Sequence, residues 1–569
     1  MTFDVDIFKH HFPLFRQAQN HSLVYLDNAA TTQKPQCVID AISHFYTAQN
    51  GNAQRASHRL AREATEVIAT VRQQAADFVG AASAANIVFT SGATASLNTL
   101  AYGLAAYCQA GDEVLLTHSE HHANLLPWQR LANNTQSQLT FFPEKDALPL
   151  WQQWPTVVNE RTRIISLTAA SNVLGNIVDF SIIAEIKKQF PHIIIVLDAS
   201  QVAAHIPLQA EQWQCDFLVC SAHKFYGPTG VGLLYMPSLW RTKLAPLLLG
   251  GEMVVSADLY TSTWATGVER FEAGTSATAA LAGLGACLQF WQQQNRVAML
   301  AYEQQLTAYL HQQLEAICTA STPLGLVTQA HNNVGVATLV VRASAGASAH
   351  SAGLSLADLA YWLDQYDIAV RVGDHCAQPL WASLQVVHDA NKGLRVSLAA
   401  YNTRQDIDRL RDAINGFLRS SYNGVSKPGE TTRDAVDDVS DLHWQALLSV
   451  RSWQQRYKLL LRWGSRISKK EAIRQVANQV QGCESLVWLQ HCRVGHRHHF
   501  RFDSDSNVIK GLAALLLVWL DGKTTEEINP DEIRACYQEL GLARHLSESR
   551  MNGFHALLNA ALHCIYDRP

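Results

Sequence analysis

Ser221-Ala222-His223-Lys224 is the stretch that decides the fold, because it ends a short apolar run with a lysine. The run itself, Cys215–Cys220, has the length and composition of a buried strand, and the turn residues of Tyr226–Gly230 then lead the chain away. A lysine at the end of a buried strand is held inside the protein and not on its surface. We therefore expect Lys224 to belong to a functional site.

A second apolar run, His192–Leu197, ends in the carboxylate of Asp198. Neighbouring parallel strands end at the same edge of a sheet, so we expect Asp198 and Lys224 to lie close together. Pyridoxal phosphate enzymes need this pair. The lysine forms a Schiff base with the cofactor, and the carboxylate keeps the pyridine nitrogen protonated so that the ring accepts electrons.

Length and composition limit the other possibilities. The 569 residues predict two or three domains, and the 48% hydrophobic and 17% charged content describes a soluble globular protein. The longest apolar candidate for a membrane span, Leu512–Leu520, is broken at Asp521, and the acidic start Met1–Asp6 is unlike a signal peptide. The net charge of -4 does not indicate nucleic-acid binding. The eleven cysteines lack a C-x-x-C pair, which argues against a zinc site or a disulfide framework. We expect a cytoplasmic protein with reduced thiols and no membrane or nucleic-acid partner.

Other apolar segments also lead into polar residues, and a helical segment at about Leu60–Val79 lies between strands. This alternation predicts a parallel α/β sheet with its site along one edge. The three further segments are Asn86–Thr90 before Ser91–Ser96, Glu113–Thr117 before Glu120–Asn124, and Ile164–Thr168 before Ser171–Gly175. The small residues of Ser91–Ser96 could cradle a phosphate, although an ordinary strand-to-helix turn explains them about equally well.

Two adjacent histidines, His121 and His122, could suggest a metal site. They point in different directions on any regular backbone, however, and no third ligand is evident. Once the lysine site is accepted, an imidazole stacked on a cofactor ring is the favoured interpretation of His121.

Six segments together resemble the class V aminotransferase-fold cysteine desulfurases, and the match runs nearly continuously from residue 1 to about 418. They are Tyr25–Pro35, Glu120–Asn124, Asp198–Gln201, Ser221–Gly230, Gly250–Met253 and Arg270–Thr275. The resemblance implies a fold type I pyridoxal phosphate-dependent transferase over residues 1–418. A large parallel-sheet domain would span about residues 20–290, and a small α+β domain would combine the N-terminal segment with about residues 291–418.

The resemblance also implies a role for each matching residue. Lys224 would carry the cofactor and move the proton at the substrate α-carbon, Asp198 would pair with the pyridinium nitrogen, and His121 would stack on the ring. The other implied residues are Thr94, Ser221 and His223 at the phosphate, Gln201 at the ring hydroxyl, Thr275 from the second subunit of a homodimer, Asn172 at cofactor and substrate, and Arg371 and Arg395 at the substrate. One departure is that the usual Arg-Gly-Thr-Thr-Glu cradle is Ser-Gly-Ala-Thr-Ala at Ser91–Ala95, which loses one hydroxyl.

The segment Ile368–Leu380 decides the chemistry, because it contains Cys376 beside Arg371 and His375. A cysteine attacks as its thiolate, which we expect these two neighbours to favour. One cysteine among eleven is more often a core residue, but the pattern R-x-G-x-H-C-x-x-P-L resembles the short cysteine loop of group II desulfurases. The resemblance implies that Cys376 takes sulfur from L-cysteine as a persulfide, leaves alanine, and passes the sulfur to an acceptor protein.

Residues 419–441 are polar and rich in chain breakers, which predicts a flexible linker, and residues 442–569 are numerous enough to fold alone. This last region resembles the SufE-like sulfur acceptors, most specifically through Gly-Cys-x-Ser-x-Val-Trp at Gly482–Trp488. The resemblance implies a separate α+β domain in which Cys483 accepts sulfur, with Asp503 and Arg550 supporting its loop. Near an expected hairpin turn, His496, His498 and His499 favour a solvated hairpin over a metal site.

Two alternatives stay open. The chain could be a selenocysteine lyase or another class V lyase, or its last region could be a docking module in which Cys483 is structural. The final recipient of the sulfur is equally open, because the resemblance suggests either an iron-sulfur scaffold or an enzyme of tRNA or cofactor thiolation.

Overall fold

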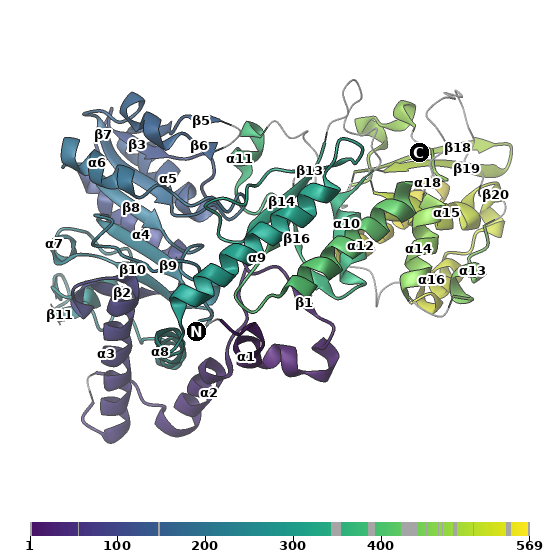
Figure 1. The fold of residues 1–569 in the computed structure, drawn as a ribbon. Coiled ribbons are helices and arrows are strands. Elements are labelled where there is room, and N and C mark those ends of the chain that lie inside the picture. The colour runs from purple at the N-terminus through teal and green to yellow at the C-terminus, as the bar shows by residue number, and fades with distance from the viewer. Residues whose placement is uncertain are drawn as a thin grey trace.

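The computed structural model describes most of the 569-residue chain. Within that part, three sheets of three or more strands follow one another along the chain, and they lie in a row from left to right in Figure 1. The described residues are 3–54, 56–145, 148–342, 354–384, 393–422, 439, 442–450, 453–464, 466–468, 470–481, 486–504, 506–541 and 548–566.

The first sheet has seven strands in the spatial order β2, β10, β9, β8, β7, β3, β4. Their bounds are β2 Ile87–Thr90, β3 Glu113–Leu116, β4 Gln138–Phe141, β7 Thr162–Thr168, β8 Ile194–Asp198, β9 Phe217–Ser221 and β10 Gly232–Tyr235. Neighbours are parallel except that β10 runs antiparallel to both β2 and β9. The sheet is thus mostly parallel, as predicted, and β10 is the exception, because its connection to β9 is too short for the crossover that a parallel neighbour needs.

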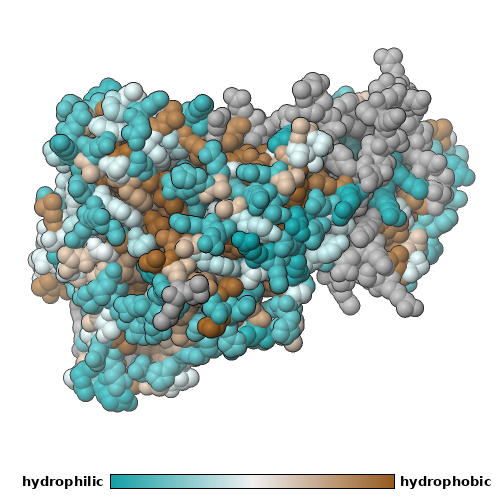
Figure 2. Space-filling model, viewed as in Figure 1, coloured by the Kyte–Doolittle hydropathy of each residue, from teal (hydrophilic) through white to brown (hydrophobic). Residues whose placement is uncertain are grey.

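Both faces of this sheet are buried, as alternate residues of β9 demonstrate. Leu218 belongs to an apolar cluster that includes α3 and α8, whereas Val219 belongs to another that includes α4 and α5. A mostly parallel sheet covered on both faces needs such continuous apolar strands. The surface differs from this interior, since Figure 2 shows mainly hydrophilic residues on the visible face. The other elements of this part are α1 Val5–His10, α2 Gln36–His44, α3 Arg59–Val79, α4 Ala93–Leu104, α5 Leu126–Thr135, β5 Glu144–Lys145, β6 Leu148–Pro149, α6 Ser181–Gln189, α7 Ser238–Arg241, β11 Val254–Ala257, β12 Ser262–Trp264 and α8 Thr278–Gln292.

The second sheet has four antiparallel strands in the order β13, β14, β17, β16. Its strands and helices are α9 Arg296–Ile317, β13 Leu324–Leu326, β14 Val336–Val341, α10 Leu356–Asp364, β16 Arg371–Gly373, α11 Gln378–Ser383, β17 Gly393–Ser397 and α12 Arg404–Tyr422. A short strand from the N-terminal segment, β1 (Val24–Tyr25), pairs in parallel with β15 (Ile368–Ala369). The N-terminal segment therefore lies beside the second sheet.

The third sheet is a long hairpin with one short added strand. The elements of this part are α13 Gln445–Leu448, α14 Trp453–Gly464, β18 Val487–Val494, β19 Arg497–Ser504, α15 Asn507–Leu520, β20 Lys523–Thr524, α16 Pro530–Glu539 and α18 Glu548–Tyr566. β18 and β19 pair antiparallel along their whole length, from Val487 with Ser504 to Val494 with Arg497. The predicted hairpin is thus present.

A shared apolar core packs the third part against the second. Phe417 of α12 belongs to the same cluster of buried side chains as Leu460 of α14 and Leu512 of α15. The hydroxyl of Ser506, which caps α15, also donates to Oδ1 of Asp358 in α10 at 3.0 Å, and both residues are buried. The C-terminal part therefore rests on the outer helices of the second part, away from the seven-stranded sheet (Figure 1).

The helix α12 continues to Tyr422 and so overlaps the first residues of the predicted linker, residues 419–441. The rest of this stretch lies outside the described residues except for Val439, whose side chain packs against the shared core. Among the helices that the structure describes, none combines the length and the hydropathy that a membrane crossing requires.

Gly511 marks a close approach of α15 to α14. A Cβ at this position would collide with the carbonyl group of Leu460, so α14 would have to move. We expect Gly511→Ala to lower the free energy of unfolding by about 1–3 kcal/mol, which is usual for overpacking. Urea unfolding of the purified protein measures the change.

Gly416→Ala is the matched control, because Gly416 lies in α12 and a Cβ there would meet Trp362 at an ordinary 3.6 Å. Alanine is also a better helix former than glycine by about 0.5–1 kcal/mol. This variant should keep or raise the stability. An equal loss in both variants would mean that the approach of α14 to α15 does not limit the fold.

Candidate active site

A cavity of about 370 Å³ contains most of the predicted site residues. The ends of β8 and β9 form one side of it, and residues of β16 and β17 and the turn after β16 contribute the other. The predicted residues that line it are Thr94, His121, Asn172, Asp198, Gln201, Ser221, His223, Lys224, Arg371, Cys376 and Arg395. Residues that are as far apart in sequence as Thr94 and Arg395 therefore share one space.

Lys224 and Asp198 lie at the edge of the sheet where the sequence predicted them. Asp198 is the last residue of β8, and Lys224 ends the single turn Ala222–Lys224 that follows β9. Burial lowers the pKa of the Lys224 amine to about 8, although the nearby carboxylate of Asp198 acts in the opposite direction. An amine with this pKa is partly neutral near physiological pH and can act as a nucleophile or a base.

The beginning of α4 forms a cradle suited to an anion. Gly92 precedes the helix, and the hydroxyl of Ser221 accepts a hydrogen bond from the Ala93 N–H at 2.9 Å. Thr94, in the first turn, lines the same cavity. Burial, with a smaller contribution from Lys224, lowers the pKa of His223 to about 4, so its imidazole is neutral. Backbone N–H groups at a helix N-terminus favour a phosphate here.

Several buried polar atoms of the cavity have no hydrogen-bond partner within the protein. They are Oδ1 of Asn172, Oγ of Ser200, Nδ1 of His375 and Nε of Arg395, and all four residues line the cavity. Buried polar groups are normally hydrogen-bonded, so these atoms fit a polar ligand. Together with the lysine, the carboxylate and the anion cradle, they are the groups that pyridoxal phosphate and an amino acid substrate require.

The ring of His121 is neutral as well, since burial lowers its pKa to about 4. Its Nδ1 accepts a hydrogen bond from the Ala123 N–H at 3.0 Å, which fixes the orientation of the ring on the cavity wall. A neutral, oriented imidazole is compatible with the predicted stacking on a cofactor ring.

Asp27 is a site residue that the sequence interpretation missed, although it lies in the Tyr25–Pro35 segment. Its carboxylate accepts hydrogen bonds from Arg371 at 2.9–3.2 Å and from Nη2 of Arg395 at 3.0 Å. The two guanidinium groups predicted to meet the substrate are thus held by one carboxylate. Only its position within the matching segment could have drawn attention to it.

Cys376 is exposed and lies on a tight turn with His375, and both residues have positive φ, of 56° and 52°. The prediction that His375 supplies positive charge to the thiol was wrong. Burial, with a smaller contribution from Arg395, lowers the pKa of His375 to about 3, so its imidazole is neutral. Arg371 is therefore the cationic side chain of the predicted pair.

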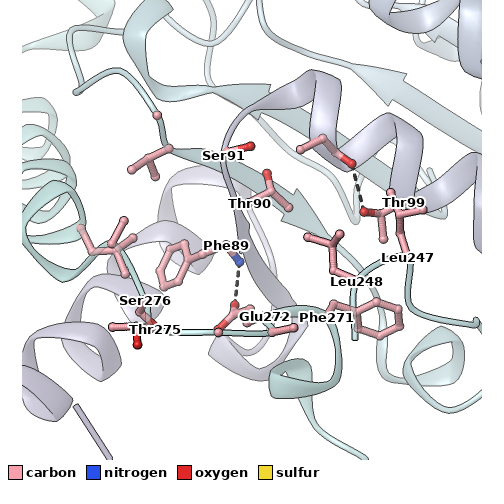
Figure 3. Close-up of a pocket in the computed structure, with 17 residues that line it drawn as sticks. Phe89, Thr90, Ser91, Thr99, Leu247, Leu248, Phe271, Glu272, Thr275 and Ser276 are labelled. Carbon is pink, nitrogen blue, oxygen red and sulfur yellow. Dashed lines mark hydrogen bonds between the residues drawn. The ribbon is translucent and has the colours of Figure 1, made fainter. Parts of the chain in front are cut away.

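Thr275 is the predicted cofactor residue that the cavity does not include. It lies in a neighbouring cavity of about 270 Å³ on its own chain, together with Ser91. Figure 3 shows Thr275 on the segment that also carries Glu272, whose carboxylate accepts a hydrogen bond from the Phe89 N–H at 2.7 Å. The role predicted for Thr275 depends on a second subunit and stays a prediction.

Of the residues predicted for sulfur acceptance, the structure describes Asp503 fully. Burial alone would raise the pKa of Asp503, but a hydrogen bond from Arg474 at 2.6 Å and the ammonium of Lys510 at 3.1 Å hold it below its usual value. Cys483 and the side chain of Arg550 lie outside the described residues. The ionised carboxylate of Asp503 is thus a fixed anchor inside the C-terminal part.

Of the three hairpin histidines, His496 is exposed and His499 is half-buried, whereas His498 differs from the prediction of a solvated hairpin. His498 is buried and lies between His491, at 2.9 Å, and the hydroxyl of Thr525, also at 2.9 Å. The ring fills a gap between β19 and the segment after β20, which its position near the turn did not reveal. Within the described ranges, no group of three or more His, Cys, Asp or Glu side chains could hold a metal ion.

Two family descriptions match different parts of the chain. Residues 24–410, more than half of the sequence, match the family described as aminotransferase class-V. The chain belongs to the class V aminotransferase family. Residues 443–562 match SufE, described as an Fe-S metabolism associated domain, so a SufE domain follows the first one. The predicted α/β fold with a separate SufE-like domain is confirmed.

The relatives that resemble the chain over most of its length include bacterial cysteine desulfurases. Those of Yersinia pseudotuberculosis serotype O:1b and Yersinia pestis are 37% identical over 421 residues, covering 72% of this chain and 97% of theirs. The crystal structure of the Escherichia coli cysteine desulfurase CsdA (S-sulfonic acid) is 30% identical with a TM-score of 0.65, covering 74% of this chain and 99% of that one. The apo cysteine desulfurase of Thermococcus onnurineus NA1 is 28% identical with a TM-score of 0.66, over 73% and 98%. These relatives do not favour the selenocysteine lyase alternative.

The three neutral histidines of the site predict a pH dependence of stability. In the folded protein, burial lowers the pKa of His375 to about 3 and those of His121 and His223 to about 4. An unfolded histidine titrates near pH 6.5, so below this pH the unfolded chain binds more protons than the folded one. The stability that these groups contribute is present above about pH 6.5 and is lost as the pH falls towards about 4.

We expect acidification over this range to lower the unfolding free energy of the cofactor-free protein, by up to about 1.4 kcal/mol per pH unit for each such histidine. His375→Gln should flatten the curve, whereas the same substitution at the exposed His331 should not. Urea unfolding at a series of pH values gives the slopes. Parallel curves for His375→Gln and the unchanged protein would mean that the burial of His375 does not lower its pKa.

Proposed function

We propose that this cysteine desulfurase transfers sulfur from L-cysteine to Cys376 and then to Cys483 of its own SufE domain. One observation carries the proposal: Lys224, Asp198 and Cys376 line the same cavity. A base for the substrate α-carbon, a carboxylate partner for the cofactor and a nucleophile for sulfur are the groups that this reaction requires.

The cofactor is pyridoxal phosphate, which when bound supplies an electron sink for the substrate α-carbon. The fit of the cradle at α4 and the unpartnered polar atoms of the cavity support its binding here. The residues that would hold it are Thr94, Ser221 and His223 at the phosphate, Asp198 at the pyridine nitrogen, Gln201 at the ring hydroxyl, His121 on the ring face, and Asn172 and Lys224 beside it.

Lys224 removes the α-proton of the substrate and returns a proton later. Its lowered pKa of about 8 supports this role, because a fully protonated amine could not accept a proton. Arg395 and Asn172 orient the substrate carboxylate. The unpartnered Nε of Arg395 and the fixed position of its guanidinium beside Asp27 support this assignment.

The thiolate of Cys376 attacks the sulfur atom of the substrate. A sulfur–sulfur bond forms, and the carbon–sulfur bond breaks with its electron pair remaining on the substrate carbon, which takes a proton to give L-alanine. The substrate sulfur stays on Cys376 as a persulfide, so the step needs no external oxidant or reductant. The positive charge of Arg371, which lines the same cavity as Cys376, faces the reacting sulfur atoms.

Cys483 then takes the outer sulfur of this persulfide, and the Cys376 thiolate leaves. Covalent linkage of donor and acceptor makes the transfer intramolecular or internal to a dimer, which raises the effective acceptor concentration to about the millimolar range. Asp503 and Arg550 support the acceptor loop. The division into residues 1–418 and 442–569 belongs to the same proposal.

A homodimer completes the cofactor site in this proposal, with Thr275 reaching the phosphate of the second subunit. Large hydrophobic side chains in the same part of the chain support a partner surface, since Leu248, Leu259 and Tyr260 are all exposed. The sulfur finally passes to an iron-sulfur scaffold or a thiolation enzyme. A cytoplasmic location agrees with the absence of disulfides among the ten cysteines that the structure describes.

Mass spectrometry after incubation with L-cysteine tests the relay. The unchanged protein should gain about 32 Da, roughly one sulfur atom, on Cys376 and on Cys483. Cys376→Ala should lose alanine formation by at least about a hundredfold, together with both adducts, because the nucleophile is missing. Cys483→Ala should still form alanine and carry the adduct on Cys376.

Cys37→Ala is the matched control, because Cys37 is an exposed thiol outside the cavity. It should change neither alanine formation nor the adducts. If Cys483 never carries sulfur while Cys376 does, the C-terminal domain is a docking module and the relay is wrong.

A further inference from the structure

The turn that carries the nucleophile is strained. His375 and Cys376 both have side chains and both adopt the left-handed region, with φ of 52° and 56°. Two consecutive non-glycine residues keep this backbone conformation only where many surrounding contacts stabilise it. Strain of this type is often found at functional sites. The contacts that hold this turn therefore determine where the thiol lies.

Two residues of the first part of the chain hold the turn from the opposite wall. The backbone N–H of His122 donates to the carbonyl oxygen of Cys376 at 2.7 Å, and Nδ2 of Asn172 donates to that of His375 at 2.7 Å. The imidazole of His122 adds a longer contact, since its Nε2 accepts from the Gln378 N–H at 3.4 Å. His122 thus contacts both the thiol-bearing residue and the backbone that follows it.

The segment that carries His122 is itself firmly anchored. The buried carboxylate of Glu120 accepts hydrogen bonds from the hydroxyl of Thr117 at 2.7 Å, the N–H of Thr168 at 3.0 Å and the amide of Asn124 at 2.6 Å. The oxygen of the Asn124 side chain in turn accepts from the indole of Trp128 at 3.0 Å. The contact of His122 therefore ties the turn of His375 and Cys376 to a segment that is itself held by several buried hydrogen bonds.

We propose that His122 is a positioning residue that holds Cys376 at the cavity that would contain the cofactor. This inference rests on the proposed function of Cys376 as the nucleophile. His121, the preceding residue, lies on the cavity wall, so one short segment fixes the ring-facing imidazole and, through His122, the nucleophile. The link between them is thus a direct contact of His122 with the turn of the second part. This gives the second histidine of the pair a role that needs no metal.

The backbone donor can be removed selectively. His122 is the first residue of the short helix His122–Asn124, where proline is tolerated because the N–H has no partner within the helix. His121 has φ of −62° and ψ of 146°, the extended conformation that suits a residue before proline. His122→Pro removes the side chain and the N–H, whereas His122→Ala removes the side chain alone.

With the cofactor-loaded full-length protein, we expect kcat for alanine formation to be about tenfold or more lower in His122→Pro than in His122→Ala, since a misplaced nucleophile slows the chemical step. KM for L-cysteine and the cofactor absorbance should stay the same in both, because neither the substrate carboxylate site nor the cofactor cradle is touched. The rate at which iodoacetamide alkylates Cys376, followed over pH, should also differ between them. Equal kcat values in the two variants would overturn the proposal.

A second pair keeps the test decisive if His122→Pro does not fold. His122→Asn retains a side-chain acceptor for the Gln378 N–H, and His122→Phe retains only a ring. We expect kcat to be a few-fold higher in the asparagine variant, and equal values would overturn the proposal for the side chain.

Cys376→Ala, measured in parallel, separates the hypothesis that Cys376 is the nucleophile from the hypothesis that His122 positions it. If it still forms alanine, the proposed nucleophile is wrong. If it is inactive while all His122 variants match the unchanged protein, the positioning role alone is wrong.

Discussion

The carboxylate of Asp27 is the contact on which the site depends most. It joins the N-terminal segment to β16 through Arg371 and to β17 through Arg395, across 344 and 368 residues of sequence. Arg395 is buried, and a buried guanidinium needs a charged partner to offset its desolvation. Without Asp27, two like charges would face each other in the cavity wall. The carboxylate of Asp27 therefore fixes the N-terminal segment against the second sheet and also orients the two arginines.

The position of the cavity follows from how the seven-stranded sheet is covered. Apolar clusters bury both of its faces, so polar side chains can occur together only where strands end. Asp198 and Lys224 lie at the ends of parallel neighbours for this reason. The second sheet then brings Cys376 to the same edge, so the thiol lies on a turn separate from the strand ends that carry Asp198 and Lys224.

The SufE domain packs directly against the second part, which the polar composition of residues 419–441 does not indicate. Its apolar core is continuous with that of α10 and α12, and the contact of Ser506 with Asp358 is buried in the same interface. The matches to the two families end at residue 410 and begin at residue 443, so the segment between them belongs to neither. A flexible connection alone would let the acceptor sample all directions, whereas this packing limits it to one side of the second sheet (Figure 1).

The sequence by itself determined the fold class, and it predicted that Asp198, Lys224 and Cys376 share one site. Strand-end motifs such as the one at Lys224, and the segment around Cys376, combine residue types that few other structures need. Local pattern also predicted the hairpin of β18 and β19. Only the tertiary structure decided the charge state of His375, the bridging role of Asp27 and the contact of His122 with the turn that carries Cys376. These properties depend on burial and on which distant segments meet, and a burial-induced pKa shift or a contact across hundreds of residues leaves no mark on the local sequence.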